Sequence, residues 1–311
     1  MARLVQAQRR IGLSSGAAHR LDARNEPFWK GWIMLRRFIA LGAAALAAAS
    51  GDTAHAAQPV SAGYNFQPAA TQVASDIAWF HSSILIPIIT AVTLLVLALL
   101  AYCAIRFRAS ANPVPSKTTH NVVIEVVWTL APIIILIVIA IPSFKLLYEQ
   151  QTTPKADLTV KAIGYQWYWG YAYPDHGNFA FDSYVVQDKD RKDPVNQPRL
   201  LAVDNEMVVP VGKVVRLQVT AQDVLHAFFV PSFGVQVTAV PGRLNEAWFK
   251  VERPGVYYGQ CNELCGKDHS SMPIAVRALP EAEFAAWVDG ARKKFAASQS
   301  LDVANAQQAG R

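Results

Sequence analysis

The stretch Cys261-Asn-Glu-Leu-Cys-Gly-Lys-Asp-His-Ser-Ser-Met272 places two thiols, an imidazole and a thioether within twelve residues. Soft sulfur ligands together with imidazole nitrogens are the donors that copper favours in proteins. His226 lies 35 residues before Cys261, in the run Asp-Val-Leu-His, and offers a second imidazole. Two of the 3 cysteines of the chain fall in this one stretch. The stretch therefore predicts a copper site.

The same two cysteines allow a second interpretation. Cysteine pairs in exported domains more often form disulfides than metal sites, and Cys261 and Cys265 alone favour a disulfide. His269, Met272 and His226 reverse this preference, because they add two imidazoles and a thioether. A blue-copper site uses one Cys, two His and a weak axial Met. Since this stretch has two cysteines, we expect two thiolates that bridge two metals.

Each bridged metal then needs its own imidazole and one weak further ligand. We expect His226 and Met272 to complete one copper, and His269 with a backbone carbonyl to complete the other. A β-sandwich that presents a Cys…His…Met loop and a distant His resembles the layout of the cupredoxins. Such a centre transfers electrons and needs no open coordination position.

The charge of the chain is distributed unevenly. The 311 residues carry a net charge of +6, with 52% hydrophobic residues and a mean hydropathy of +0.17, which indicates a chain with both membrane and soluble parts. Residues 1–57 hold 8 basic against 3 acidic residues, whereas residues 151–290 hold 13 basic against 16 acidic. The mildly acidic C-terminal part favours basic partners over nucleic acid.

Residues 1–57 read as an N-terminal extension followed by a cleaved signal peptide. Met34-Leu-Arg-Arg-Phe supplies a basic start, residues 38–49 are apolar, and Ala54-His55-Ala56 offers a cleavage site of small residues. The apolar stretch is too short to span a bilayer, which needs about 20 residues. We expect the mature chain to begin near Gln58.

Residues 58–150 predict a transmembrane hairpin with helices at about 84–105 and 126–147. Residues 84–105 and 126–144 are apolar and free of charge, and each run is long enough for a helix that spans a bilayer. The loop between them holds Arg106, Arg108 and Lys117, so the positive-inside rule places it in the cytoplasm. The later part of the chain then lies outside. With the signal peptide, this predicts a multi-pass protein of a bacterial inner membrane whose copper domain is periplasmic.

Residues 151–290 predict an all-β, cupredoxin-like Greek-key sandwich. Val215, Leu217 and Val219 alternate with polar residues, and turn pairs such as Pro241-Gly242 separate the runs. From Pro280 the pattern becomes helical, with early acidic and late basic residues. We expect residues 291–311 to contain the end of this helix and a disordered tail after Ala297.

These motifs together resemble subunit II of the bacterial, aa3-type haem–copper cytochrome c oxidases. The resemblance covers about residues 70–290. It is carried by Tyr258-Gly-Gln-Cys-Asn-Glu-Leu-Cys-Gly-Lys-Asp-His-Ser-Ser-Met-Pro273, Gln166-Trp-Tyr-Trp169, Phe181-Asp-Ser-Tyr184, Asp223-Val-Leu-His226, Pro241-Gly-Arg-Leu-Asn245 and Glu125-Val-Val-Trp-Thr-Leu-Ala-Pro132.

The resemblance implies a dinuclear copper A centre with six protein ligands. Cys261 and Cys265 bridge both coppers, the main-chain carbonyl of Glu263 binds one of them, and His226, His269 and Met272 act as described above. It also implies that the Glu263 carboxylate binds a magnesium ion shared with subunit I.

Four further residues gain roles from the resemblance alone. Trp167 receives the electron from docked cytochrome c, Asp182 and Asp223 belong to an acidic docking face, and Glu125 marks the cytoplasmic mouth of a proton path. Taken singly, each acid is an ordinary solvated or helix-capping residue, and an aromatic-rich strand is usually core or membrane belt.

The implied function is that of an electron-accepting oxidase subunit. It takes electrons from cytochrome c and passes them to haem in subunit I, where oxygen is reduced to water and protons are pumped. Its partners would be subunit I, subunit III, cytochrome c and membrane lipid. The main alternative is a membrane-anchored copper chaperone or thiol-redox protein, which would have one membrane helix, a βαβ pattern and no Met272.

Overall fold

The computed structural model describes residues 59, 63, 65–193 and 196–309, with side chains up to residue 295. All of them belong to one compact unit that spans Ala54–Arg311. The predicted extension and signal peptide at 1–57 lie outside the described residues.

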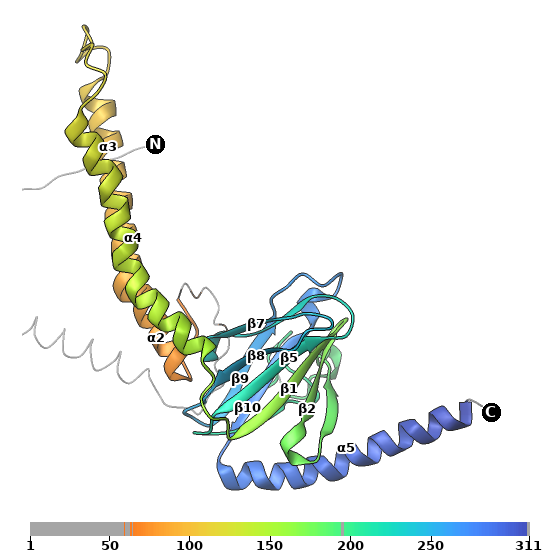
Figure 1. Cartoon of the computed structure of the whole chain (residues 1–311). Helices are drawn as coiled ribbons and strands as arrows, with labels where there is room; N and C mark the ends of the chain where they lie inside the picture. The colour runs from red at the N-terminus through yellow and green to blue at the C-terminus, as the bar shows by residue number, and fades with distance from the viewer. Residues whose placement is uncertain (1–58, 60–62, 64, 194–195, 310–311) are drawn as a thin grey trace, which may run out of the picture. The chain divides into compact units, whose positions relative to one another are not determined.

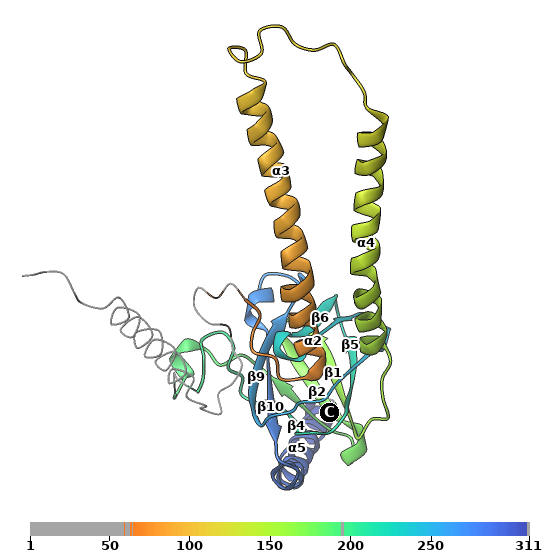
Figure 2. The same cartoon turned by 90° about the vertical axis from the view of Figure 1, so that its left-hand side faces the viewer.

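The N-terminal half of the described chain forms two long apolar helices joined by a loop. The first runs without a break through α2 (Gln72–Phe80), the π-helical segment η1 (His81–Leu85) and α3 (Ile86–Arg106). The second is α4 (Val122–Gln151). Both are long and apolar enough to cross a membrane. Figure 2 shows α3 and α4 as separate columns joined by the loop.

Both helices extend beyond the predicted ranges because polar caps set their first residues. The Thr71 side chain accepts a hydrogen bond from the backbone N–H of Ala74 at 3.1 Å, so α2 begins 12 residues before the predicted start at Ile84. The Asn121 side chain likewise accepts from the N–H groups of the first turn of α4. Because a capping side chain satisfies the unpaired N–H groups of a first turn, the helix starts at the cap rather than at the first apolar residue.

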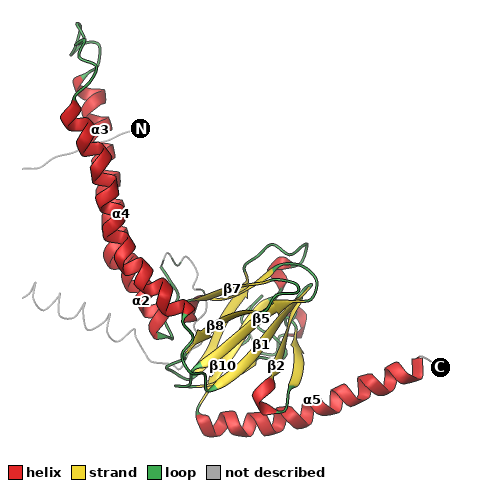
Figure 3. Ribbon diagram, viewed as in Figure 1, coloured by secondary structure: helices red, strands yellow, loops and turns green. Residues whose placement is uncertain are grey.

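The C-terminal half is a β-sandwich of two five-stranded sheets, seen as two layers in Figures 1 and 3. One sheet has the strand order β3-β2-β1-β5-β8 and the other β4-β10-β9-β6-β7. The β1–β5 and β4–β10 pairs are parallel and the other pairs antiparallel. The strands are β1 (Leu158–Tyr165), β2 (Tyr168–Tyr173), β3 (Phe179–Ser183), β4 (Met207–Pro210), β5 (Val215–Ala221), β6 (His226–Val230), β7 (Val235–Ala239), β8 (Asn245–Phe249), β9 (Gly255–Cys261) and β10 (Pro273–Leu279).

The alternating residues of the strands supply the core between the sheets. Val215, Leu217 and Val219 of β5 are fully buried while the residues between them are half-buried, as the alternation predicted. Trp169 from one sheet packs edge-on against Phe228 from the other, with ring centroids 5.5 Å apart. The close-packed core therefore holds the two sheets in a fixed arrangement, and the loops at the ends of the strands start from fixed positions.

Helix α5 (Glu281–Ala309) follows β10 and packs by its first half on β3. Trp287 lies 5.9 Å from Phe179, and Phe295 stacks on Phe181 at 4.5 Å between ring centroids. The helix continues to Ala309, and the segment after Ala297 contains no glycine or proline before Gly310.

A substitution at Gly259 of β9 tests whether the close approach of β9 to β6 requires glycine at this position. A Cβ at this position would collide with the Phe229 carbonyl and lie 2.9 Å from its carbon atom. We expect Gly259→Ala to lower the free energy of unfolding by about 1–3 kcal/mol, measured by chemical denaturation with tryptophan fluorescence.

Gly290→Ala is the matched control, because nothing lies within 4 Å of its Cβ position in α5. Alanine is there a better helix former, so stability should be kept or raised. Equal stability of the two variants would show that the β6–β9 contact is not tight.

Candidate metal centre

Three neighbouring strands bring the predicted ligands together at one end of the sandwich. His226 is the first residue of β6, Cys261 is the last residue of β9, and Met272 immediately precedes β10. Strands β10, β9 and β6 are neighbours in one sheet, and Phe228 pairs with Cys261. Because β6 and β9 are antiparallel, the start of one meets the end of the other. His226 therefore lies beside the cysteine loop.

Backbone hydrogen bonds close the loop that carries the other donors. The N–H of Cys261 donates to the carbonyl of Met272 at 3.2 Å, and the N–H of Asn262 donates to the carbonyl of Ala227 at 3.1 Å. Inside the loop, the Gln260 side-chain amide donates to the Ser270 carbonyl at 2.6 Å. Both ends of the loop are thus held by the sheet, and its side chains keep fixed directions.

The two thiols face each other without being bonded. Cys261 and Cys265 are buried free cysteines whose sulfur atoms lie 4.0 Å apart. A disulfide requires about 2.05 Å, so the disulfide interpretation does not describe this structure. A metal–thiolate bond is about 2.3 Å long, so one ion can contact both sulfur atoms across this separation.

The remaining predicted donors surround these sulfur atoms. His226 Nδ1 and the Glu263 carbonyl oxygen lie 3.9 Å and 3.4 Å from Cys261 Sγ. His269 Nδ1 and Met272 Sδ each lie 3.5 Å from Cys265 Sγ. His226, Cys261 and Cys265 offer ligand atoms within 4.8 Å of one another. The soft, buried donor set fits copper, whereas the division of ligands between two ions stays a prediction.

Asp223 orients the imidazole of His226. Its Oδ1 lies 2.9 Å from His226 Nε2 and accepts the N–H of Val224, while its Oδ2 accepts the N–H of Gln166 at 2.7 Å. A carboxylate can only accept, so the neutral ring carries its hydrogen on Nε2 and directs the lone pair of Nδ1 towards Cys261. This is the carboxylate–histidine arrangement that fixes metal-binding imidazoles.

In the metal-free protein, the pKa values of His226, Cys261 and Cys265 are shifted by burial and by the contacts among these residues and Asp223. Burial lowers the pKa of His226, but contacts with Cys261 and Asp223 outweigh burial and raise it. Burial raises the pKa of both thiols. Hydrogen bonds, first from His226, bring the pKa of Cys261 below its usual value, whereas the nearby Cys261 charge raises that of Cys265 further. The Cys261 thiol therefore loses its proton more readily than the Cys265 thiol.

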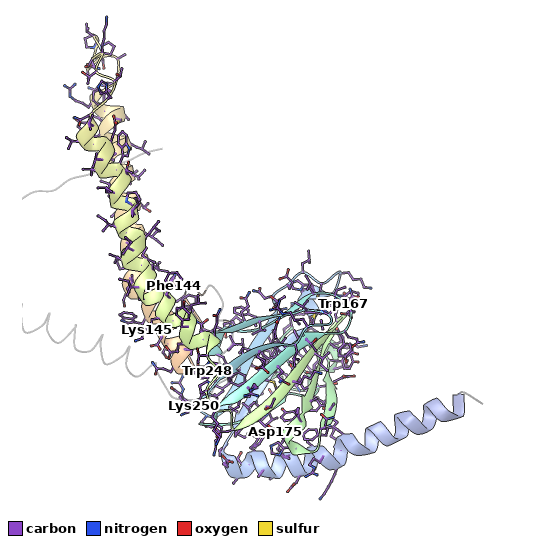
Figure 4. The ribbon with its side chains drawn as sticks, in the orientation of Figure 1. Phe144, Lys145, Trp167, Asp175, Trp248 and Lys250 are labelled. Atoms are coloured by element: carbon purple, nitrogen blue, oxygen red, sulfur yellow. The ribbon has the colours of Figure 1, made fainter. Side chains whose placement is uncertain are left out.

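Trp167 is attached directly to the donor loop. Its indole N–H donates to the Cys265 carbonyl at 3.2 Å, and the Gln166 side-chain amide donates to the same oxygen at 2.9 Å. Gly266, at φ +127°, permits this approach, because a Cβ there would lie 2.9 Å from the indole ring. Figure 4 shows Trp167 at the end of the sandwich, remote from Asp175. The ring is half-buried and connects the surface with Cys265.

The other predicted residues lie elsewhere. Asp182 is exposed on β3, where partial desolvation and the nearby Asp204 raise the pKa of its carboxyl group, although the Tyr184 hydroxyl donates to it at 3.4 Å. Glu125 lies in the first turn of α4 and accepts the N–H of Asn121, as a helix-capping residue does. The structure brings neither residue to the donor cluster.

Sequence analysis missed the positioning roles of Asp223 and Gln166. Both residues stand in motifs that were singled out, but Asp223 was assigned only to docking and Gln166 to no role. The spacing of Asp223 and His226 does not reveal their contact, because three residues outside a helix fix no geometry.

Comparison with known proteins identifies the family. The chain matches "Cytochrome C oxidase subunit II, transmembrane domain" over residues 59–146 and "Cytochrome C oxidase subunit II, periplasmic domain" over residues 158–279. It is 44% identical over 284 residues to a probable cytochrome c oxidase subunit 2 of Rickettsia felis, covering 91% of this chain and 86% of the relative. It is 45% identical over 278 residues to cytochrome c oxidase subunit 2 of Cereibacter sphaeroides, covering 81% and 90%.

Among solved structures, the crystal structure of the periplasmic domain of subunit II of cytochrome oxidase from Bradyrhizobium japonicum is similar. It is 63% identical and covers 46% of this chain and 99% of its own, with a TM-score of 0.43.

The fold and the donor cluster define a membrane-anchored, cupredoxin-like protein with a site suited to copper. The chain belongs to the cytochrome c oxidase subunit II family. It is therefore a transmembrane component of a respiratory oxidase complex with other subunits, and its sandwich is the periplasmic domain. The two membrane helices, the sandwich fold and this membership exclude the copper chaperone and thiol-redox alternatives.

The Asp223 carboxylate should contribute to copper affinity. We expect Asp223→Ala to weaken copper binding by about 10- to 100-fold, because the His226 ring loses the partner that fixes its orientation. Competition titration of the reduced, metal-free protein with copper measures this change.

Asp182→Ala removes the same charge from the surface of the same domain and serves as the control, with affinity expected to stay unchanged. Copper binding by Asp223→Ala as tight as that of the unmodified chain would refute the positioning role.

Proposed function

We propose that this chain accepts electrons from reduced cytochrome c at a dinuclear copper A centre and passes them to haem in subunit I. Oxygen is there reduced to water, and the reaction is coupled to proton pumping. The chain acts only in complex with subunit I, accompanied by subunit III. The observation that carries this proposal is the convergence of four further donor groups on two buried, unbonded thiols, with Trp167 hydrogen-bonded to the Cys265 carbonyl.

The chain's own residues supply the ligands and hold them in place. Cys261, Cys265, His226, His269, Met272 and the Glu263 carbonyl would hold the two coppers. When bound, the copper pair supplies reversible one-electron storage shared by two metals. The strands β6, β9 and β10 hold the donors on a packed core, which limits their movement when the charge of the site changes.

Trp167 is the proposed point at which the electron arrives. Its ring reaches the surface on one side and bonds to the Cys265 carbonyl on the other. Lys267 lies over the ring, with Nζ 5.6 Å from the centroid. The hydrogen bond and the close approach at Gly266 keep the ring against the donor loop.

Asp182 and Asp223 are the proposed acidic docking residues for the basic cytochrome c. Charged residues of opposite sign on two partners accelerate their encounter and make it sensitive to salt. Asp182 is exposed, and Asp223 is about one-third exposed beside its bond to His226. Asp182 therefore tests docking by itself, whereas a change of Asp223 also alters the metal site.

Two further roles depend on partner subunits. The Glu263 side chain is exposed at the tip of the donor loop, and we assign it to a magnesium ion shared with subunit I. Glu125, in the first turn of α4, is assigned to the cytoplasmic mouth of a proton path into subunit I. We further propose that the chain lies in a bacterial inner membrane, surrounded by lipid, with its copper domain in the periplasm, since the basic loop between its helices predicts a cytoplasmic loop.

The metal content of the purified complex tests the proposal. We expect two coppers per chain in addition to those of subunit I, together with near-infrared absorbance. One copper per chain that is lost when the thiols are oxidised would overturn the dinuclear assignment.

Met272→Leu tests the thioether ligand, since leucine has similar volume and no sulfur donor. We expect the variant to fold and to bind copper with a changed absorption spectrum and reduction potential, because a weak thioether ligand tunes a copper–thiolate centre. An unchanged spectrum would remove Met272 from the ligand set.

Trp167→Ala tests electron acceptance. We expect turnover with cytochrome c to fall by at least about 100-fold, a barrier change of about 2.7 kcal/mol, while copper content and absorption persist. Oxygen consumption measures turnover. Trp248→Ala, an indole on β8, is the control. Normal turnover by Trp167→Ala would assign the role to another residue.

A further inference from the structure

The two membrane-spanning segments form a groove at their outer ends that the proposed function does not use. The groove lies between α2 and α4 and has a volume of about 360 Å³. Its walls combine apolar residues with three charged side chains, those of Asp76, Lys145 and Glu149.

Both walls of the groove are fixed to the sandwich. At the start of α2, the Thr71 hydroxyl donates to the Phe233 carbonyl at 2.8 Å. At the end of α4, the Trp248 indole N–H donates to the Glu149 carbonyl at 3.1 Å. Figure 4 marks Trp248 on the sandwich and Lys145 on α4. Since each wall has its own attachment, the groove is a built feature of the fold.

The position of the groove along α4 corresponds to lipid headgroups. The uncharged stretch Val126–Phe144 has 19 residues and is about 28 Å long at the α-helical rise of about 1.5 Å per residue. This length matches the hydrocarbon core of a bilayer, about 30 Å. Lys145 is the first charged residue after that stretch, so Lys145 and Glu149 reach the outer headgroup layer.

The charges in the groove suit a ligand that carries both signs. Among the described residues, neither Lys145 nor Glu149 has an ion-pair partner, and Asp76 accepts one hydrogen bond, from the Gln72 side chain at 2.9 Å. Glu149 lies near the C-terminal end of α4, where the helix dipole favours a cation. Two carboxylates and one ammonium give the groove a net charge of −1.

We propose that this groove binds the headgroup of a phospholipid with a primary ammonium group, such as phosphatidylethanolamine. The lipid ammonium donates hydrogen bonds to Asp76 and Glu149, and the lipid phosphate accepts from Lys145. An acyl chain then follows Phe80 and Ile141 towards the hydrocarbon core.

The chemistry of the groove discriminates among headgroups. A phosphatidylcholine ammonium has no N–H to donate, so it forms only the weaker ionic contact with the carboxylates. An anionic phosphatidylglycerol headgroup brings no cation and meets two negative charges. The proposal goes beyond electron transfer and does not depend on the copper site.

Lipid competition on the intact oxidase complex tests the proposal. The complex is exchanged into detergent with phosphatidylethanolamine, phosphatidylcholine or phosphatidylglycerol of identical acyl chains, and bound lipid is counted by native mass spectrometry. The bound lipid that disappears from the complex when Glu149→Gln or Lys145→Gln is introduced is the lipid that occupies this groove. We expect it to be phosphatidylethanolamine, bound about tenfold more tightly than phosphatidylcholine.

Matched controls remove the same charges outside the groove. Glu252 and Lys155 are exposed residues that do not line the groove. The complexes with Glu252→Gln or Lys155→Gln should retain the lipid. Glu149 and Lys145 are themselves exposed, so their variants should assemble with normal copper content. The proposal is overturned by equal binding of the three lipids, by preference for phosphatidylglycerol, by variants that keep the lipid, or by a protein segment that fills the groove in the complex.

Discussion

The antiparallel pairing of β6 with β9 is the constraint on which the site depends. It places the first residue of β6, His226, against the last residue of β9, Cys261. Gly259 permits this approach, because its Cα meets the backbone of Phe229 where a side chain would collide. The neighbouring β10 fixes Met272 through the bond between the Cys261 N–H and the Met272 carbonyl. Donors that are distant in sequence thus converge on a frame packed from both sheets.

A second layer of contacts joins the metal ligands to the surface. The Asp223 carboxylate contacts His226 with one oxygen and the Gln166 backbone with the other. The Cys265 carbonyl then accepts from both Gln166 and Trp167. Gln166 and Trp167, in the turn between β1 and β2, are therefore hydrogen-bonded both to Asp223, which contacts His226, and to the carbonyl of Cys265. Asp223 therefore both orients His226 and lies partly at the surface.

Much of this arrangement was predictable from the sequence. The hydrophobic lengths predicted two spanning helices, and the alternation in β5 predicted buried Val215, Leu217 and Val219. The helix starts were misplaced, because Thr71 and Asn121 cap helices at residues that hydropathy does not mark.

The sequence by itself determined the chemistry of the donors, since two thiols, two imidazoles and a thioether in this spacing are soft ligands whatever their surroundings. Only the tertiary structure decided that the thiols remain unbonded 4.0 Å apart, that Asp223 orients His226, and that Trp167 lies on the Cys265 carbonyl. The reason is that a donor's identity is a property of one residue. Its direction and its neighbours depend on strand pairing between segments tens of residues apart.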